Sequence, residues 1–173
     1  DTQQSQRLYR HLPNMPTTRA SQPHDLPAIT AIYQHHVLHG TGTFETEAPS
    51  EADMQQRRAD VLAKGLPYIV AVDDSGQVLG FAYANWFKPR PAYRFSAEDS
   101  IYVADQARGQ GVGRLLLDQL VTDCEALGVR KLLAVIGDSR NAGSIGVHRA
   151  AGFTEAGILR GMGDSVSALL FLL

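Results

Sequence analysis

Residues 106–114 read Gln-Ala-Arg-Gly-Gln-Gly-Val-Gly-Arg, and this glycine-rich stretch decides the fold. It follows a short run at residues 100–103 and precedes an amphipathic run that extends from Leu115 to Leu127. This order predicts a strand, a tight turn and the start of a long helix. Glycine lets the backbone approach a ligand closely, and the N–H groups of a first helical turn attract anions. With the positive charges of Arg108 and Arg114 beside it, the stretch predicts a site for a phosphate-bearing ligand.

Other glycine-rich phosphate loops fit this stretch less well. No Gly-Lys-Ser/Thr follows it, which excludes a Walker A loop. A dinucleotide site is disfavoured because arginines lie in the turn and because an antiparallel hairpin is predicted upstream. The competing interpretation is a turn that is purely structural.

The bulk properties bound the function classes. The chain has 173 residues, of which 44% are hydrophobic and 20% charged, so one domain with a sizeable core is expected. A net charge of −2 argues against nucleic acid as a main partner, and no apolar run is long enough to span a membrane. The single cysteine, Cys124, excludes an intrachain disulfide and fits a reducing, cytoplasmic location. We expect residues 1–16 to form a flexible N-terminal extension and residues 17–173 to form the domain.

Helix and strand signals place the glycine turn in an α/β chain. Asp25 is predicted to cap a helix whose apolar positions begin at Leu26, and Ser50 with Asp53 forms a capping-box pattern. Residues 73–76, Asp-Asp-Ser-Gly, predict a turn that joins two strands into an antiparallel hairpin. The expected strands are 17–20, 68–72, 78–86, 99–103, 131–136, one from Phe153 and 168–173, and the other expected helices are 54–64, one from the glycine turn to about Leu127, and 141–151.

Several side chains could carry chemistry. Glu98, next to the strand that feeds the glycine turn, is either a general base or a solvated charge, and His148 is either a functional or a packed helix histidine. Spacing alone leaves both alternatives open. His35 and His39 share a helix face, but no acidic or cysteine ligand accompanies them, so we interpret the cluster of His35, His36 and His39 as a solvated helix end rather than a metal site.

A basic and aromatic loop precedes the strand that feeds the turn. Residues 88–94 read Lys-Pro-Arg-Pro-Ala-Tyr-Arg, with aromatic residues on both sides. Aromatic residues of this kind usually anchor a loop or a core. Guanidinium groups bind carboxylate and phosphate in a bidentate manner, so the loop could also hold a small anionic substrate.

The order of these parts resembles the GNAT acetyltransferases, which bind acetyl-coenzyme A. The glycine turn carries Arg108-x-x-Gly111-x-Gly113, and the later Asn141 and His148-x-x-x-Gly152-Phe153 resemble the second cofactor segment of that family. The resemblance is closer still to the phosphinothricin and methionine-sulfoximine N-acetyltransferases, and it covers about residues 18 to 160. It rests on the segments 32–35, 43–44, 86–93, 98–103, 135–137 and 141–148.

The resemblance implies a GNAT acyltransferase fold, an α/β architecture whose central mixed, mostly antiparallel sheet is splayed at the cofactor site and flanked by helices. It also implies transfer of an acetyl group from acetyl-CoA to the primary amine of a small amino-acid-like substrate, without a metal. Homodimers are common in the family, so a homodimer is expected.

The resemblance also assigns roles to residues. Glu98 would be the base, directly or through a water. His148, where many relatives have tyrosine, would act as an acid or stabilise the complex. A backbone N–H of Tyr102 or Val103 would stabilise the oxyanion. The implied cofactor-binding residues are Tyr102, Val103, Arg108, Gly109, Gln110, Gly111, Val112, Gly113, Arg114 and Asn141. The implied substrate-side residues are Phe44, Lys88, Tyr93 and Arg94.

One segment departs from the family pattern. After Leu159-Arg160, residues 161–166 are shorter than in such enzymes and lack their Trp and Lys. This affects the expected substrate pocket. Two alternatives therefore stay open, a GNAT enzyme for another amine, such as a protein N-terminus or an aminoglycoside, and a non-catalytic coenzyme-binding sensor.

Overall fold

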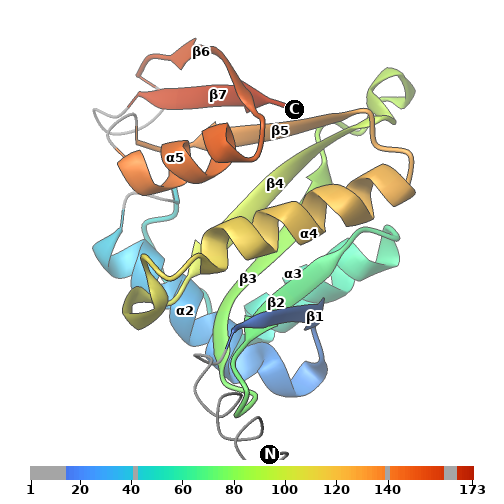
Figure 1. Cartoon of the computed structure of the whole chain (residues 1–173). Helices are drawn as coiled ribbons and strands as arrows, with labels where there is room; N and C mark the ends of the chain where they lie inside the picture. Colours follow the sequence, from blue (N-terminus) through green and yellow to red (C-terminus); the bar gives the residue numbers. More distant parts are fainter. Residues whose placement is uncertain (1–14, 41–42, 139–140, 162–166) are drawn as a thin grey trace, which may run out of the picture.

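Seven strands form one mixed sheet in the order β1-β2-β3-β4-β5-β7-β6 (Figure 1). Every neighbouring pair is antiparallel except β4 and β5, which are parallel. The mostly antiparallel mixed sheet and the β2–β3 hairpin are therefore confirmed. The strands are β1 Thr17–Ala20, β2 Tyr68–Val72, β3 Val78–Trp86, β4 Ser96–Val103, β5 Lys131–Ile136, β6 Thr154–Leu159 and β7 Ala168–Leu172.

The structure is a computed structural model that describes residues 15–40, 43–138, 141–161 and 167–173. Most of the expected extension, residues 1–14, and residues 162–166 of the shortened segment lie outside these ranges. Within them, no helix is both long and apolar enough to cross a membrane.

Helices cover both faces of the sheet. Helices α2 and α3 pack on one face against β2, β3 and β4, whereas α4 crosses the other face and α5 packs against α4 and β5 (Figure 1). Helix α4 buries Val112, Leu116, Leu120 and Cys124, a spacing of four residues that forms one apolar stripe. The helices are α2 Leu26–His39, α3 Glu51–Ala63, α4 Val112–Ala126 and α5 Ala142–Ala150, with short 3-10 turns η2 Pro23–Asp25, η3 Pro91–Tyr93 and η4 Asp105–Ala107.

The capping box of α3 was predicted correctly, although the helix begins at Glu51 rather than at residue 54, and the cap of α2 was wrong. The Ser50–Asp53 capping box is present. Asp25 precedes α2 but its side chain does not cap it, because its carboxylate binds Arg19 at 2.7 and 2.8 Å and accepts the N–H of Gln22 at 2.7 Å. The turn η2, which leads straight into α2, gives Asp25 a helical backbone that a capping residue does not have.

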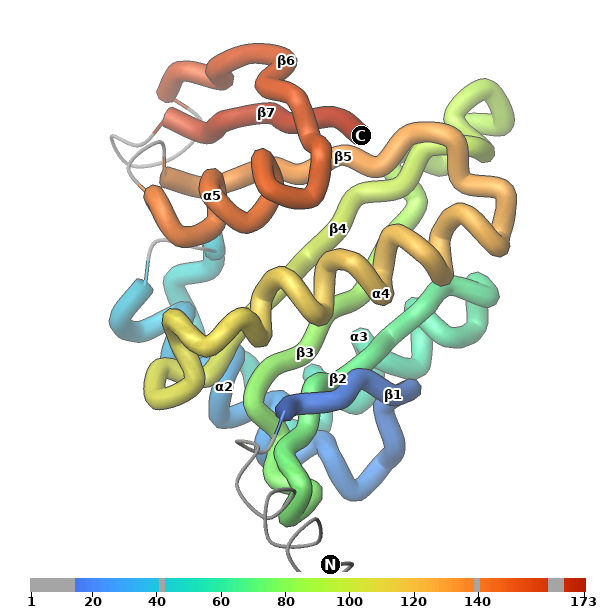
Figure 2. Tube along the Cα trace, in the orientation of Figure 1, coloured from blue at the N-terminus to red at the C-terminus, as the bar shows by residue number. Residues whose placement is uncertain are grey.

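The sheet opens between β4 and β5. The two strands pair only at Ser96, Ala97 and Glu98. Beyond Glu98 they separate, and the rest of β5 pairs with β7 alone, as the traces in Figure 2 show. The expected splay is therefore present, and it begins directly after Glu98.

Adjacent residues of β4 face opposite sides of the sheet. Side chains alternate along a strand, and residues directly opposite each other share a face. Glu98 lies opposite Asn85, and Ser100 lies opposite Tyr83, which in turn lies opposite Tyr68. This row faces α3, because Tyr68, Tyr83 and Asn85 line a cavity with that helix. Asp99 faces α4 and α5.

The ion pair between half-buried Arg19 and buried Asp25 leads to a stability prediction. Burial raises the pKa of Asp25, but the hydrogen bonds from Arg19 and Gln22 outweigh burial and hold the pKa below its usual value. Replacing Asp25 by Asn (Asp25→Asn) is expected to lower the free energy of unfolding at neutral pH by about 2 kcal/mol, since a charged hydrogen-bond acceptor is lost. Urea unfolding measures this difference.

The pH dependence of that difference follows from the lowered pKa. The carboxylate stabilises the fold above its unfolded-state pKa, and this contribution disappears as the pH falls through the lower folded-state pKa. The variant and the parent should therefore converge in stability at acid pH. Asp74→Asn, at an exposed turn position, is the control, and equal stability of all three proteins at neutral pH would contradict the prediction.

Candidate active site

The glycine turn has the backbone that only glycine adopts easily. Gly109 and Gly111 have φ values of +73° and +80°, and Gly111 is the N-cap of α4. The first N–H groups of α4 therefore point out of the helix beside a turn without side chains. This is the anion-binding arrangement that the sequence predicted.

A cleft of about 660 Å³ lies between β4, the N-terminus of α4 and α5. It is lined by all the predicted cofactor-binding residues except Gln110, whose side-chain amide instead donates to the carbonyl of Gln106 at 3.0 Å. Asn141 lines the cleft and also caps α5, where its Oδ1 accepts the N–H of Ser144. The cleft fits a long ligand with a phosphate group at the glycine turn.

The two arginines beside the turn differ in their partners. Arg108 is exposed and lies 3.3 Å from Asp105. Arg114 binds Asp118 at 2.7 Å and donates to the carbonyl of Ala150 at 2.6 Å, so its guanidinium links α4 to α5. Arg108 is therefore the better placed of the two to meet a phosphate.

The phase of β4 decides which backbone N–H groups face the cleft. The N–H of Ala104 donates to the carbonyl of Leu79, on the β3 side. Because hydrogen-bonding directions alternate along a strand, Tyr102 also directs its N–H to β3, whereas Ile101 and Val103 direct theirs to the splay. The sequence led us to expect the backbone N–H of Tyr102 or Val103 as the oxyanion donor. The N–H of Val103 faces the splay and that of Tyr102 does not. The N–H of Ile101 also faces the splay and was not predicted.

At the end of α2, His36 is half-buried rather than solvated, which corrects its prediction, whereas His39 is exposed as predicted. Both line the cleft, and His36 Nε2 donates to the carbonyl of Val103 at 2.9 Å. Burial is the main cause that lowers the pKa of His36, so its ring is neutral at physiological pH. Within the described ranges, no three His, Cys, Asp or Glu side chains gather as a metal-binding group.

His148 is buried with both ring nitrogens engaged. Its Nδ1 donates to the carbonyl of Ser144 at 2.7 Å, and its Nε2 lies 3.2 Å from Oδ1 of Asp99. Burial would lower the pKa of His148, but Asp99 outweighs it and raises the pKa. Burial also raises the pKa of Asp99, whose Oδ2 has no partner among the described residues. We infer that one proton is held between Nε2 and Oδ1.

The hydrogen bonds of His148 argue against a role as the base of a nucleophilic serine and against a role as an acid. Ser144, His148 and Asp99 resemble a nucleophilic triad, and Ser144 Oγ lies 3.4 Å from Nδ1. However, Nδ1 carries a proton because a carbonyl can only accept, so it cannot take one from the serine. Proton donation to the cleft would break the bond to Asp99, so the geometry supports the stabilising role better than the acid role.

Glu98 is half-buried at the point where the sheet opens, on the face opposite to Asp99 and His148. Burial raises the pKa of Glu98, the neighbouring Asp99 raises it further, and Lys88 lowers it in part. A carboxylate with a raised pKa is a better proton acceptor at neutral pH than an exposed one. The environment therefore suits a general base.

The predicted substrate-side residues have different surroundings. The Lys88 ammonium lies 5.2 Å from the Phe87 ring centroid, and Tyr93 contacts the same ring edge-on. The guanidinium carbon of Arg94 lies 4.4 Å from the Phe95 ring centroid, and that of Arg130 lies 4.1 Å from the same centroid. Arg94 therefore stabilises the loop by stacking, whereas Lys88 acts on Glu98. Phe44 is exposed on the α2–α3 connection.

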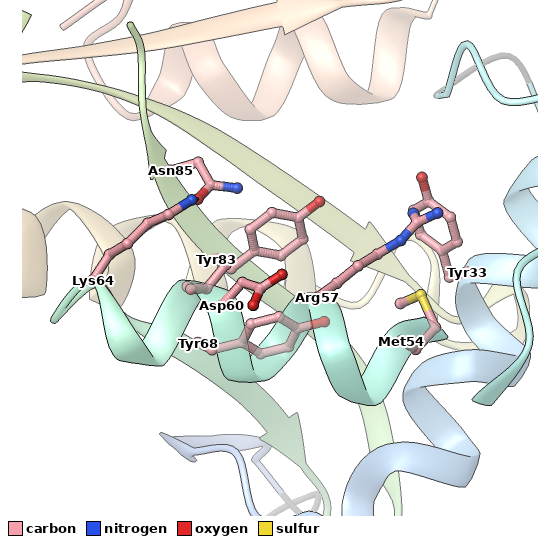
Figure 3. A pocket seen from close by; sticks show the side chains of 9 residues that line it. Tyr33, Met54, Arg57, Asp60, Lys64, Tyr68, Tyr83 and Asn85 are labelled. Atoms are coloured by element: carbon pink, nitrogen blue, oxygen red, sulfur yellow. The ribbon is translucent and has the colours of Figure 1, made fainter. Parts of the chain in front are cut away.

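A second cavity, of about 160 Å³, lies between α3 and strands β2 and β3. Figure 3 shows the side chains of α3 along one wall and the stacked rings of Tyr68 and Tyr83 along the other. This cavity is not predictable from a motif, because its lining residues come from four elements that are far apart in the sequence. One signal in the sequence was available. Tyr83 and Asn85 are two residues apart in their strand, which places them on the same face of the sheet, and Tyr68 lies in the neighbouring strand.

Comparison with known proteins identifies the family. The acetyltransferase (GNAT) family model matches residues 29–153. The chain is 52% identical over 147 residues to the phosphinothricin N-acetyltransferase of Alcaligenes faecalis, which covers 85% of this chain and 74% of that protein. It is 39% identical over 150 residues to the L-methionine sulfoximine/L-methionine sulfone acetyltransferase of Pseudomonas paraeruginosa, with 86% of each covered.

A solved structure agrees with this result. The phosphinothricin acetyltransferase of the GNAT superfamily from Sinorhizobium meliloti, in complex with AcCoA, is 42% identical and matches with a TM-score of 0.86, covering 92% of this chain and 88% of that one. On the evidence of sequence, topology and splayed sheet together, this chain belongs to the acetyltransferase (GNAT) family.

Proposed function

We propose that this protein transfers an acetyl group from acetyl-CoA to the primary amine of a small amino acid whose side chain ends in a phosphinate, sulfone or sulfoximine group. The names of the similar enzymes support this class of acceptor. The observation that carries the proposal is the splay directly after Glu98. The cofactor cleft lies between β4, α4 and α5 and reaches the end of α2, and a polar cavity lies between α3, β2 and β3.

The two substrates approach from opposite faces and meet at the splay. Acetyl-CoA supplies the acetyl group as a thioester, with its pyrophosphate at the glycine turn and Arg108. Asn141 and the edge of β4 line the path from that turn to the splay. The acceptor reaches Glu98 from the α2 and α3 face. This arrangement keeps the reacting amine and the thioester in one small gap.

Glu98 removes the proton that blocks attack. An amino-acid amine is mostly protonated at neutral pH, and only the free base is a nucleophile. Glu98 accepts this proton, directly or through a water, and its raised pKa makes the transfer easier. The N–H of Val103 or Ile101, which faces the splay, stabilises negative charge that develops on the acetyl oxygen. As the new C–N bond forms, the C–S bond of the thioester breaks, and coenzyme A leaves as a thiolate that takes up a proton.

The remaining predicted residues take supporting roles. His148, bonded to Asp99 and to the Ser144 carbonyl, positions α5 against β4 at the wall of the cleft. Lys88, Tyr93 and Phe44 are proposed to face the acceptor, and the charge of Lys88 also tunes Glu98. Arg94 is proposed to hold the loop that carries Lys88 and Tyr93.

We also propose that the enzyme is a cytoplasmic homodimer. Strand β6 is the edge of the sheet, and Ile158 and Leu159 on it are exposed apolar side chains that suit contact with a second copy. The single buried thiol of Cys124 fits a reducing compartment.

A thiol-release assay with an acceptor panel tests the proposed function. The panel contains phosphinothricin, methionine sulfoximine, methionine sulfone, an aminoglycoside and a peptide with a free N-terminus. Turnover is expected with the three tetrahedral amino acids only. Turnover confined to the aminoglycoside or the peptide would show that the acceptor is another class of amine. Coenzyme binding without any turnover would favour a non-catalytic sensor.

The role of Glu98 as base leads to a prediction on rate and pH. Glu98→Gln is expected to lower kcat by about a hundredfold or more, because proton transfer is lost, with the Kd for acetyl-CoA unchanged. In the parent, kcat/KM should rise with pH through the raised pKa of Glu98. Lys88→Met removes a charge that lowers the pKa of Glu98. In this variant, the rise of kcat/KM with pH should therefore occur at higher pH than in the parent. Steady-state kinetics against pH measures both effects.

Glu125→Gln is the matched control, since that carboxylate is exposed near the far end of α4. It should leave both kcat and the pH profile unchanged. A Glu98→Gln enzyme with the parent's pH profile would remove Glu98 as the base.

The glycine turn offers a matched pair of variants. Gly111 and Gly128 have φ values of +80° and +81°, and neither has a neighbour that an added Cβ would meet. Gly111→Asp and Gly128→Asp therefore impose similar backbone strain. Only Gly111→Asp places a negative charge at the phosphate site, so it alone should abolish thermal stabilisation by coenzyme A. Equal stabilisation of both variants would reject the phosphate site.

A further inference from the structure

The cavity under α3 contains a buried hydroxyl group without a partner. Tyr68 is 2% exposed, and its hydroxyl has no hydrogen bond to any described residue. A buried polar group left unpaired is costly and calls for an explanation, and a guest that binds in the cavity beside it is one. Burial raises the pKa of Tyr68, so the hydroxyl keeps its proton and can donate. The rings of Tyr68 and Tyr83 lie side by side in Figure 3, at the floor of the cavity.

The cavity begins next to the proposed base. Asn85 lines it and lies directly opposite Glu98 in the β3–β4 ladder, and Tyr68 lies one strand further away. Opposite residues on one face have Cβ atoms about 5 Å apart. An amino acid whose amine meets Glu98 can therefore extend its side chain towards Tyr68.

Apart from the Asp60 carboxylate, whose Oδ1 accepts from Gln56 at 2.9 Å, the polar groups of the lining can all donate hydrogen bonds. Lys64 donates to Oδ1 of Asn85 at 3.2 Å, which leaves the NH₂ group of that amide as a donor. Arg57 is paired with Glu45 at 2.6 Å, so its charge is balanced within the protein. The cavity therefore favours a guest that presents acceptor oxygens.

The apolar part of the lining is small. Met54 and Val61 of α3 are both buried and line the cavity, and Figure 3 shows Met54 at the end near Tyr33. A thioether and a branched side chain offer contact to a methyl-sized group rather than to a long chain. Phosphinothricin, methionine sulfone and methionine sulfoximine each end in a tetrahedral centre that carries one methyl group and polar acceptor atoms.

We propose that this cavity is the subsite for the tetrahedral head group of the acceptor. The oxygens of the head group bind the Tyr68 hydroxyl and the Asn85–Lys64 pair, and its methyl group contacts Met54 and Val61. This inference rests on the proposed function. It assigns acceptor specificity to residues of β2 and α3 that lie outside the glycine turn and the basic loop.

The test removes only the Tyr68 hydroxyl. Tyr68→Phe is expected to raise the KM for methionine sulfone about tenfold, as loss of one hydrogen bond to the head group would. The KM for acetyl-CoA, which binds at the other face of the sheet, should stay unchanged. The thermal midpoint of the free protein should stay equal or rise, because a buried unpaired hydroxyl has been removed.

Thr30→Val is the matched control. Thr30 Oγ1 is also buried without a partner among the described residues, but Thr30 lines neither cavity. This variant should behave like Tyr68→Phe in thermal stability and like the parent in every KM. The comparison separates loss of a ligand contact from relief of an unpaired hydroxyl.

A charge variant separates the head groups. Lys64→Gln should raise the KM for phosphinothricin, whose head is anionic, about fivefold, and that for the neutral methionine sulfone less than twofold. Lys131→Gln, at an exposed position outside the cavity, should change neither.

A KM for methionine sulfone within twofold of the parent in Tyr68→Phe would overturn the subsite and leave the proposed function standing. If the parent acetylates none of the tetrahedral amino acids, the proposed function fails first, and the subsite fails with it.

Discussion

Where β4 stops pairing with β5, between Glu98 and Asp99, the sheet opens, and the candidate site is arranged around that gap. A paired strand would use its N–H groups in the ladder. Because β5 continues with β7 instead, the N–H groups of Ile101 and Val103 face open space between the strands. The same separation makes room for the cleft beside the glycine turn. The ligand site is therefore built from backbone groups that a closed sheet would have consumed.

Because side chains alternate between the two faces along β4, the neighbouring carboxylates Glu98 and Asp99 lie on opposite faces of the sheet at this gap. Glu98 faces α2 and α3, where burial raises its pKa and Lys88 limits the rise. Asp99, the next residue, faces α5 and holds His148. The carboxylate proposed as the base and the carboxylate that holds His148 thus lie side by side in the chain, on opposite faces of the sheet. This division supports separate entry of coenzyme and acceptor.

Much of the fold could be predicted because local signals were strong. The glycine turn, the β2–β3 hairpin and the Ser50–Asp53 capping box depend on neighbouring residues and were found correctly. Asp25 was misinterpreted because Arg19, on β1, competes for its carboxylate. His36 was taken for a solvated residue because its partner, the carbonyl of Val103, lies 67 positions away. Such errors arise where a distant partner determines the role of a residue.

The sequence by itself determined the order of elements, the anion-binding turn before α4 and the residues that resemble the family's base and cofactor segments. These features follow from backbone propensity and from short motifs, which act over a few residues. Only the tertiary structure decided that Val103 rather than Tyr102 directs its N–H to the splay. It also decided that His148 is held by Asp99, and that the Tyr68 hydroxyl in the cavity under α3 finds no partner among the described residues. Strand phase, burial and pairing between elements are properties of the folded chain, because they depend on contacts between residues far apart in sequence.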